Sequence, residues 1–241
     1  LTRSYRSPDL NQLIGRPSVS RTEPASGANS ELTADSAGNP ALKPEVAIGI
    51  DIAIERYLAD GGVLSANLFH RRINDLIRSV VALEDVSWSP GQPRYVARPQ
   101  NIGKATTQGL ELEAKFRLDQ LIDDGPRTEI RANASIFRSR VEAVPGPDNR
   151  LAEQPGGALN FGMDHRFRGL PLTVGGNLNH TPGYRTRLEA DRFIVQSQKT
   201  VLDAYALWTF SPELKLRLSL SNALALDTSA TTEVSSAALT E

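Results

Sequence analysis

The sequence predicts an all-β fold, an antiparallel transmembrane β-barrel of which about eight strands are visible, and three observations indicate it. Apolar and polar residues alternate strictly in two long segments, as in a strand with one face in an apolar medium and one in a polar medium. Short turns and long polar loops alternate along the chain, as in outer-membrane barrels. The alternate positions of the second segment are all charged and those of the first include Asp51 and Glu55, which fits the lining of a polar barrel interior.

The alternation is clearest in residues 46–55 and recurs in residues 110–119. Its apolar positions are Val46, Ile48, Ile50, Ile52 and Ile54 in the first segment, and Leu110, Leu112, Ala114, Phe116 and Leu118 in the second. Between the latter lie Glu111, Glu113, Lys115, Arg117 and Asp119. A soluble β-sandwich would also give a period of two, but the charge density and the loop asymmetry favour a barrel wall.

The composition of the chain is compatible with this fold and excludes other classes. The 241 residues carry a net charge of −1, so no basic surface predicts nucleic-acid binding. No apolar run approaches the roughly 18 residues that a transmembrane helix needs, whereas a barrel strand needs only alternate apolar residues. Cysteine is absent, which excludes disulfides and cysteine-ligated metals. Residues 1–5 do not resemble a signal peptide, and we expect the chain to be a piece of a longer, secreted polypeptide.

Eight strands are predicted, and they are joined alternately by short and long connections. They cover residues 46–57, 63–75, 103–118, 127–139, 157–168, 172–182, 200–210 and 214–223. The short joins contain Gly, Pro or Asp, which supply the backbone dihedral angles of tight turns. The long joins are residues 14–45, 76–102, 140–156 and 183–199, and a tail follows residue 224. In an outer-membrane barrel the short turns lie on the periplasmic side and the long loops on the exterior.

Aromatic residues lie near the short-turn ends of the predicted strands. Phe116, Phe167, Trp208 and Phe210 share the parity of the apolar positions in their strands. Aromatic rings favour the membrane–water boundary, so these four residues are interpreted as a girdle. Packing in the core of a sandwich is the alternative interpretation.

Several segments carry a family resemblance. They are Arg6–Leu13, Asn39–Glu45, Ala66–Ile77, Asn101–Ala105 leading into Gly109–Glu113, and Leu218–Asn222. In this order and spacing they resemble the C-terminal half of the barrel of TonB-dependent outer-membrane receptors. The physical interpretation agrees: proline ends the loop before Glu45, and Gly103 and Gly109 would let a strand bend or admit a close neighbour.

The resemblance implies the C-terminal part of a 22-stranded barrel, with residues 1–241 forming a partial barrel domain. The family's plug domain and energy-coupling segment have no counterpart in this sequence, and neither has the final strand. The implied function is energised uptake of a scarce substrate, a ferric siderophore or another metal chelate, across the outer membrane of a Gram-negative bacterium. The implied partners are outer-membrane lipid, the plug domain, an inner-membrane energy-coupling complex acting through the plug, and the chelate. A passive porin-like channel and a soluble β-sandwich binding module are the alternatives.

No enzyme signature, phosphate-binding loop or dinucleotide fingerprint occurs, so neither catalysis nor a cofactor is expected. His70, His165 and His180 lie far apart on apolar positions near strand ends, which favours interfacial placement over metal ligation. Arginines and aromatic rings in the predicted loops suit anionic, planar ligands such as iron chelates. These ligand-binding candidates are Arg78, Trp88, Arg94, Tyr95, Tyr184, Arg185 and Arg187. The alternative is that they are ordinary polar loop residues that bind no ligand.

Overall fold

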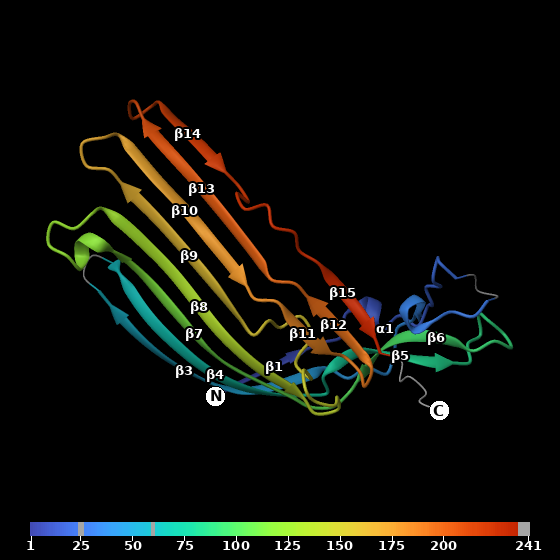
Figure 1. Ribbon diagram of the computed structural model, residues 1–241. Helices are drawn as coiled ribbons and strands as arrows, with labels where there is room; N and C mark the ends of the chain where they lie inside the picture. Colours follow the sequence, from blue (N-terminus) through green and yellow to red (C-terminus); the bar gives the residue numbers. More distant parts are fainter. Residues whose placement is uncertain (24–26, 59–60, 236–241) are drawn as a thin grey trace.

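The computed structural model describes residues 1–23, 27–58 and 61–235, and its largest feature is a curved, nine-stranded antiparallel sheet (Figure 1). Its strands, in spatial order, are β1 (Thr2–Arg6), β3 (Glu45–Tyr57), β4 (Val63–Asn74), β7 (Ala105–Arg117), β8 (Thr128–Val141), β9 (Gly157–Arg166), β10 (Leu172–Thr181), β13 (Lys199–Thr209) and β14 (Lys215–Leu220). Within the described residues β1 and β14 each have one neighbour in this sheet, so the barrel is not closed.

Eight of these strands confirm the predicted segments, with ends that differ by a few residues. The ninth, β1, was not expected, because only one side chain between Thr2 and Arg6 is apolar and the segment shows no alternation. It is a strand because its backbone pairs with β3, where Tyr5 lies opposite Val46 and Thr2 opposite Gly49.

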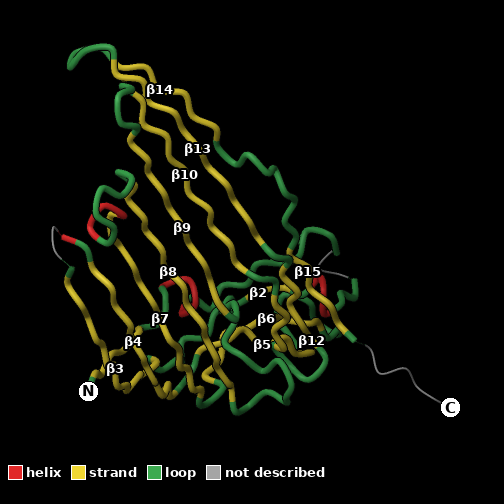
Figure 2. Tube along the Cα trace, turned by 60° about the vertical axis from the view of Figure 1, so that its left-hand side comes forward, coloured by secondary structure: helices red, strands yellow, loops and turns green. Residues whose placement is uncertain are grey.

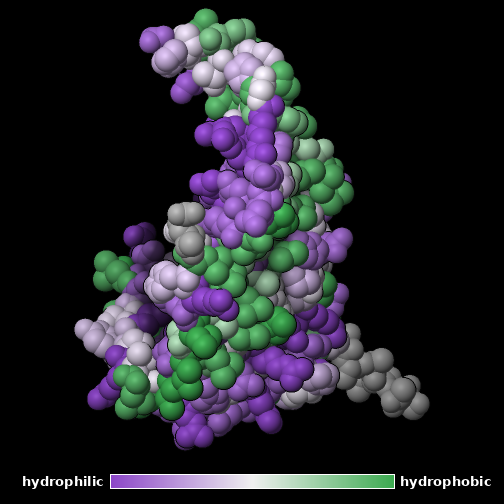
Figure 3. Space-filling model, turned by 90° about the vertical axis from the view of Figure 1, so that its left-hand side faces the viewer, coloured by the Kyte–Doolittle hydropathy of each residue, from purple (hydrophilic) through white to green (hydrophobic). Residues whose placement is uncertain are grey.

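The register places the predicted apolar positions of neighbouring strands side by side on the convex, outer face. Ile52 pairs with Leu68, Leu68 with Leu110, and Leu110 with Ile136. Ile52 remains 65% exposed and Ile136 62% exposed, so no other part of the described chain covers this face. Figure 3 shows hydrophobic and hydrophilic residues in separate patches along the sheet, with hydrophilic residues predominating at its lowest part.

The opposite face carries the predicted charged residues. Glu113 lies opposite Asn133, Lys115 opposite Arg131, and Arg117 opposite Glu129. Side-chain hydrogen bonds continue across the same face: Asp164 on β9 accepts one from Arg131 on β8 and one from Tyr205 on β13. Cross-strand pairing of opposite charges stabilises neighbouring strands, so this face forms a connected polar lining.

Gly109 admits a close aromatic contact on the same face. The rings of Phe69 and Phe137, on the strands either side of β7, lie 6.2 Å apart across it. A Cβ at Gly109 would come within 2.8 Å of both rings. The prediction that this glycine admits a close neighbour is confirmed, and Gly103 adopts a φ of +114°, which favours glycine.

The long connections contain further strands, which the eight predicted strands do not include. Strands from these connections form two three-stranded sheets at one end of the large sheet (Figure 2), although residues 142–156 contribute none. One contains β2 (Asp35–Ser36), β6 (Arg94–Asn101) and β5 (Ile77–Glu84), and the other β11 (Tyr184–Arg187), β12 (Arg192–Gln196) and β15 (Ala230–Val234). The helical segments α1 (Leu10–Leu13), η1 (Glu31–Thr33) and η3 (Leu118–Gln120) are short.

The small sheets form because the loops bury apolar residues of their own. Val96 on β6 is fully buried against Ala37 and Val86, with Trp88 packed beside them. A second cluster joins the loops to the strand ends: Leu76, Ala105, Val141 and Val144. Such residues are scattered through polar sequence, and neither cluster was predicted.

The short joins and the aromatic residues lie at the opposite end of the large sheet (Figure 1). The Trp208 and Phe210 rings are 6.3 Å apart, and Phe167 packs edge-on against His165 at 4.6 Å. Residues 59–60 of the turn at 58–62 lie outside the described residues, as do residues 24–26 of the first loop. None of the described helices is long and apolar enough to cross a membrane.

Candidate functional site

Asp35 forms the centre of the first small sheet and fixes two of the predicted ligand-binding residues. Arg94 binds it through two nitrogens, with Nε–Oδ2 at 2.6 Å and Nη2–Oδ1 at 2.9 Å. Trp88 Nε1 donates to Asp35 Oδ2 at 2.8 Å. The Asp35 and Arg94 side chains are both 0% exposed. The structure therefore places Arg94 and Trp88 in an ion-pair and hydrogen-bond network inside the loop sheet.

The electrostatics of this network agree with its geometry. Hydrogen bonds from Arg94 lower the pKa of Asp35 to about 2, opposing the effect of burial. The same hydrogen bonds raise the pKa of Arg94 above its ordinary value. Tyr95, the next residue, is half-buried, and its backbone N–H and C=O both bond the Asn29 side chain.

Arg78 on β5 joins the two small sheets. It is 7% exposed and donates to the backbone oxygens of Arg150 at 3.0 Å and of Arg187 and Leu188 at 3.3 Å each. Burial lowers the pKa of its guanidinium, although the nearby Glu189 opposes this. Glu189 accepts a hydrogen bond from the Val81 N–H at 3.2 Å, and burial raises the pKa of its carboxyl.

Arg185 and Arg187 lie together over the ring of Phe193 in the second small sheet. Their guanidinium carbons are 3.7 Å and 4.7 Å from the ring centroid. Arg185 is exposed and also pairs with Glu233 at 3.1 Å. Tyr184, half-buried at the start of β11, has its pKa raised by burial. The Phe193 ring itself is only 4% exposed, so the group presents cationic surface that is held in place by a buried ring at the long-loop end of the molecule.

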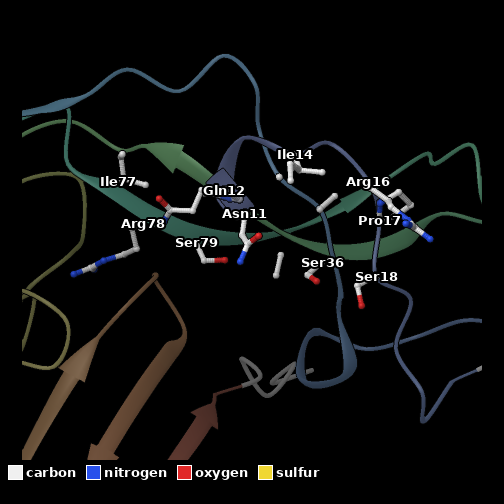
Figure 4. A pocket seen from close by; sticks show the side chains of 14 residues that line it. Asn11, Gln12, Ile14, Arg16, Pro17, Ser18, Ser36, Ile77, Arg78 and Ser79 are labelled. Carbon is white, nitrogen blue, oxygen red and sulfur yellow. The ribbon is translucent and has the colours of Figure 1, made fainter. Parts of the chain in front are cut away.

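A pocket of about 670 Å³ lies between α1, β2 and β5 (Figure 4). Asn11, Ser36 and Ser79 lie around its opening, with Ile14 beside them. Arg78 also lines it, but its guanidinium extends away toward the second small sheet. The accessible polar groups are thus amides and hydroxyls, which can donate hydrogen bonds to a polar ligand and can accept them, together with the guanidinium of the exposed Arg16, which only donates.

The sequence-predicted residues thus form two groups, with Arg78 between them. Trp88, Arg94 and Tyr95 stabilise the first sheet, and Arg185 and Arg187 share Phe193 in the second. Apart from Arg78, sequence analysis missed the pocket residues, and it also missed Asp35; these residues lie in polar loop sequence without a pattern. Phe193 carried a usable signal, because the apolar run Phe193–Val195 interrupts a polar loop.

No group of three or more His, Cys, Asp or Glu within the described residues could hold a metal ion. The histidines lie on the outer face and bond single neighbours. His70 pairs with Gln108 at 3.2 Å, His165 with Thr128 at 2.7 Å, and His180 with Thr200 at 2.8 Å.

Comparisons with solved structures show the fold. The ferric enterobactin receptor PfeA of Pseudomonas aeruginosa matches 92% of the chain at a TM-score of 0.59 and 20% identity. The siderophore receptor PirA of Acinetobacter baumannii matches 92% of the chain at a TM-score of 0.59 and 17% identity. The siderophore receptor PirA of P. aeruginosa matches 96% of the chain at a TM-score of 0.58 and 16% identity. The chain spans only 31%, 34% and 38% of those three proteins. A comparison with curated proteins found no match.

A family model described as "TonB dependent receptor-like, beta-barrel" matches residues 1–223. This range includes the nine strands of the large sheet and both strands of the β5–β6 and β11–β12 hairpins. The chain therefore belongs to the TonB-dependent receptors and forms part of their β-barrel domain.

Proposed function

We propose that the chain is part of an outer-membrane receptor for energised uptake of a metal chelate, a ferric siderophore being the first candidate. Family membership supports the receptor, and the neighbours named as siderophore receptors support this substrate class. The observation that carries the proposal is the asymmetry of the molecule. A wall with an apolar outer face ends in short turns on one side and in two folded loop sheets on the other.

The proposed orientation follows from this asymmetry. The outer face, with exposed Ile50, Ile52 and Ile54, would contact lipid. The short turns would lie in the periplasm and the loop sheets outside the cell, as in other outer-membrane barrels of Gram-negative bacteria. A soluble β-sandwich does not agree with the family or with an uncovered apolar face on so large a sheet.

The proposed ligand surface consists of residues that the loop sheets leave accessible. Arg185 is exposed and Arg187 is half-buried, so the two guanidiniums supply cationic surface above the buried Phe193 ring, and the half-buried Tyr184 adjoins them. Asn11 and Ser79 in the pocket supply hydrogen-bonding groups. Arg78, Trp88 and Arg94 position these surfaces by holding the loop sheets together, and Tyr95 does so through its backbone.

The polar inner face fits a second element of the proposal, a plug domain inside a complete barrel of about 22 strands. Its charged ladders, such as Arg131 with Asp164, could hydrogen-bond a plug surface. An inner-membrane complex acting on that plug would supply the energy, and no catalytic chemistry is assigned to this chain. Residues 1–241 would then be a partial barrel domain.

The test is binding and uptake of iron-loaded chelates by the complete receptor. Arg185→Ala together with Arg187→Ala should weaken binding of an anionic chelate by about tenfold or more, since a cation–π and charge contact is worth about 1–2 kcal/mol. Lys215→Ala, on β14 near the short-turn end, is the matched control. Unchanged affinity for every chelate tried would reject the proposed ligand surface.

A passive porin-like channel is the second candidate, because an open polar lumen without a plug would also fit this wall. Uptake separates the two functions. The receptor should stop accumulating chelate when the inner-membrane proton gradient is collapsed, whereas a passive channel should continue to equilibrate it.

A further inference from the structure

The outward positions of the large sheet change from apolar to basic at the long-loop end. On β8 they read Ile130, Ala132, Ala134 and Ile136, and then Arg138 and Arg140. On β4 they read Leu64, Ala66 and Leu68, and then His70 and Arg72. The apolar band therefore has a basic border on these strands.

The register brings the arginines of this border close together. Arg72 and Arg140 both lie opposite Thr106 on β7, so their backbones are two strand spacings apart, about 10 Å. Arg138 is two residues from Arg140 along β8, on the same face. Arg3 on β1 extends the row, because it lies opposite Ile48, which in turn pairs with Arg72. We call Arg72, Arg138 and Arg140 the outer arginine cluster.

These arginines have no counter-ion within the described part of the chain. All three are exposed, and none of their guanidinium groups forms an ion pair or a hydrogen bond with a described residue. The strand register shows why: no outward position of the nine strands in the large sheet, as far as the structure describes them, is Asp or Glu. The acidic residues of these strands, such as Asp51, Glu113 and Asp164, lie on inward positions.

A groove of about 410 Å³ lies directly below the cluster on the same strands. Its apolar side is formed by Leu68, Leu110 and Ile136, and its polar side by His70, Gln108 and Arg138. The groove thus continues from apolar surface into the arginine cluster. Such an arrangement suits a molecule with an acyl chain and an anionic headgroup.

We propose that the outer arginine cluster binds the phosphate groups of an acidic lipid of the outer leaflet, with one acyl chain lying in the groove. This inference rests on the outer-membrane orientation proposed above. A guanidinium binds phosphate through paired hydrogen bonds and is only weakly hydrated, so it suits a headgroup at the membrane boundary. Three such groups without internal partners would recognise phosphate charge at the boundary where the apolar band ends.

The experiment measures lipid retained by the complete receptor. The protein, purified in detergent, is incubated with a diphosphorylated, multiply acylated glucosamine lipid or with its dephosphorylated form, and the bound lipid is counted by native mass spectrometry. Wild type should retain the phosphorylated form preferentially. Each single Arg→Gln change in the cluster should weaken this binding about fivefold, the effect expected of one basic residue near an anionic surface.

Two further variants control for charge and for folding. Arg56→Gln removes an exposed arginine on the outward parity of β3 at the short-turn end, where it lies opposite Leu64, and it should retain lipid like wild type. A variant that combines Arg72→Lys, Arg138→Lys and Arg140→Lys should bind more lipid than a variant in which the same three arginines are changed to glutamine. Each variant must keep the heat-modifiable migration of a folded barrel.

Equal retention of both lipid forms by wild type would overturn the inference, as would an equal loss in Arg56→Gln. Chelate binding is measured on the same samples, so the two proposals are separated. If the receptor selects the phosphorylated lipid but binds no chelate, the proposed substrate is refuted and the lipid site is supported. If the receptor binds chelate but does not distinguish the two lipid forms, the lipid site is refuted and the proposed substrate class is supported.

Discussion

Asp35→Asn should loosen the first loop sheet without disturbing the barrel wall. The native carboxylate accepts two hydrogen bonds from Arg94, one from Trp88 and one from the Ser20 N–H, in a fully buried setting. The pKa of Asp35 falls from 3.8 to about 2 on folding, a difference that corresponds to about 2 kcal/mol in favour of the charged form. Because the folded pKa is the lower one, this stabilisation is present above pH about 4 and is lost as the pH falls through about 2.

The assay is hydrogen exchange followed by mass spectrometry on the complete receptor at neutral pH. A loss of about 2 kcal/mol in local opening free energy should speed exchange in β2, β5 and β6 by about 30-fold. Arg94→Ala should have a larger effect, about 3–5 kcal/mol, because it leaves a buried carboxylate unpaired.

Glu84→Gln is the matched control, since it removes an ion pair in the same sheet that is only partly buried. Arg98 and Glu84 are 2.8 Å apart, with side chains 26% and 27% exposed. A pair this accessible should contribute about 1 kcal/mol or less. Equal effects of Asp35→Asn and Glu84→Gln, or unchanged exchange in Asp35→Asn, would refute the structural role assigned to Arg94.

Three other perturbations test different parts of the structure. Leu112→Arg, on the outer face between Ala66 and Ala134, should reduce the stability of the barrel in bilayers by about 2–4 kcal/mol. Glu113→Ala, on the inner face, should reduce it by less, and equal losses in the two variants would contradict the assigned faces. Gly175→Ala should destabilise the wall by about 1–3 kcal/mol, measured by urea unfolding, because the new Cβ meets Asp164 and the Tyr205 ring. Gly156→Ala should be neutral, because only Arg150 lies near the new Cβ, at 3.8 Å. Arg78→Met should speed hydrogen exchange near residues 150 and 187–188, since three backbone oxygens lose their donor; unchanged exchange there would show that Arg78 does not join the loops.

The wall could be predicted from the sequence because its pattern is local. In a strand, side chains alternate between faces whatever the partner, so Ile48 to Ile54 and Leu110 to Phe116 indicate strands by themselves. The pairing of β1 depends on β3, and the sequence between Thr2 and Arg6 contains no trace of it.

The loop sheets could not be predicted for a related reason. Their stability depends on contacts between segments far apart in the chain, such as Asp35 with Arg94 and Arg78 with Arg187. The candidate ligand residues were chosen by chemistry alone, and chemistry does not distinguish a buried arginine from an accessible one. Arg94 and Arg185 are both loop arginines, yet one is fully buried and the other is exposed.

The orientation of the wall is the central claim, and thiol labelling of single cysteine variants tests it most directly. Residues 1–241 contain no cysteine, so Ser87→Cys, Arg185→Cys and Asp124→Cys each add one thiol at an exposed position to a receptor whose cysteines elsewhere, where present, are replaced by serine. With a membrane-impermeant maleimide on intact cells, the Ser87→Cys and Arg185→Cys variants of the complete receptor should react. Asp124→Cys, in a short turn, should react only after the outer membrane is breached. Labelling of Asp124→Cys on intact cells, with Ser87→Cys and Arg185→Cys protected, would contradict the proposed orientation.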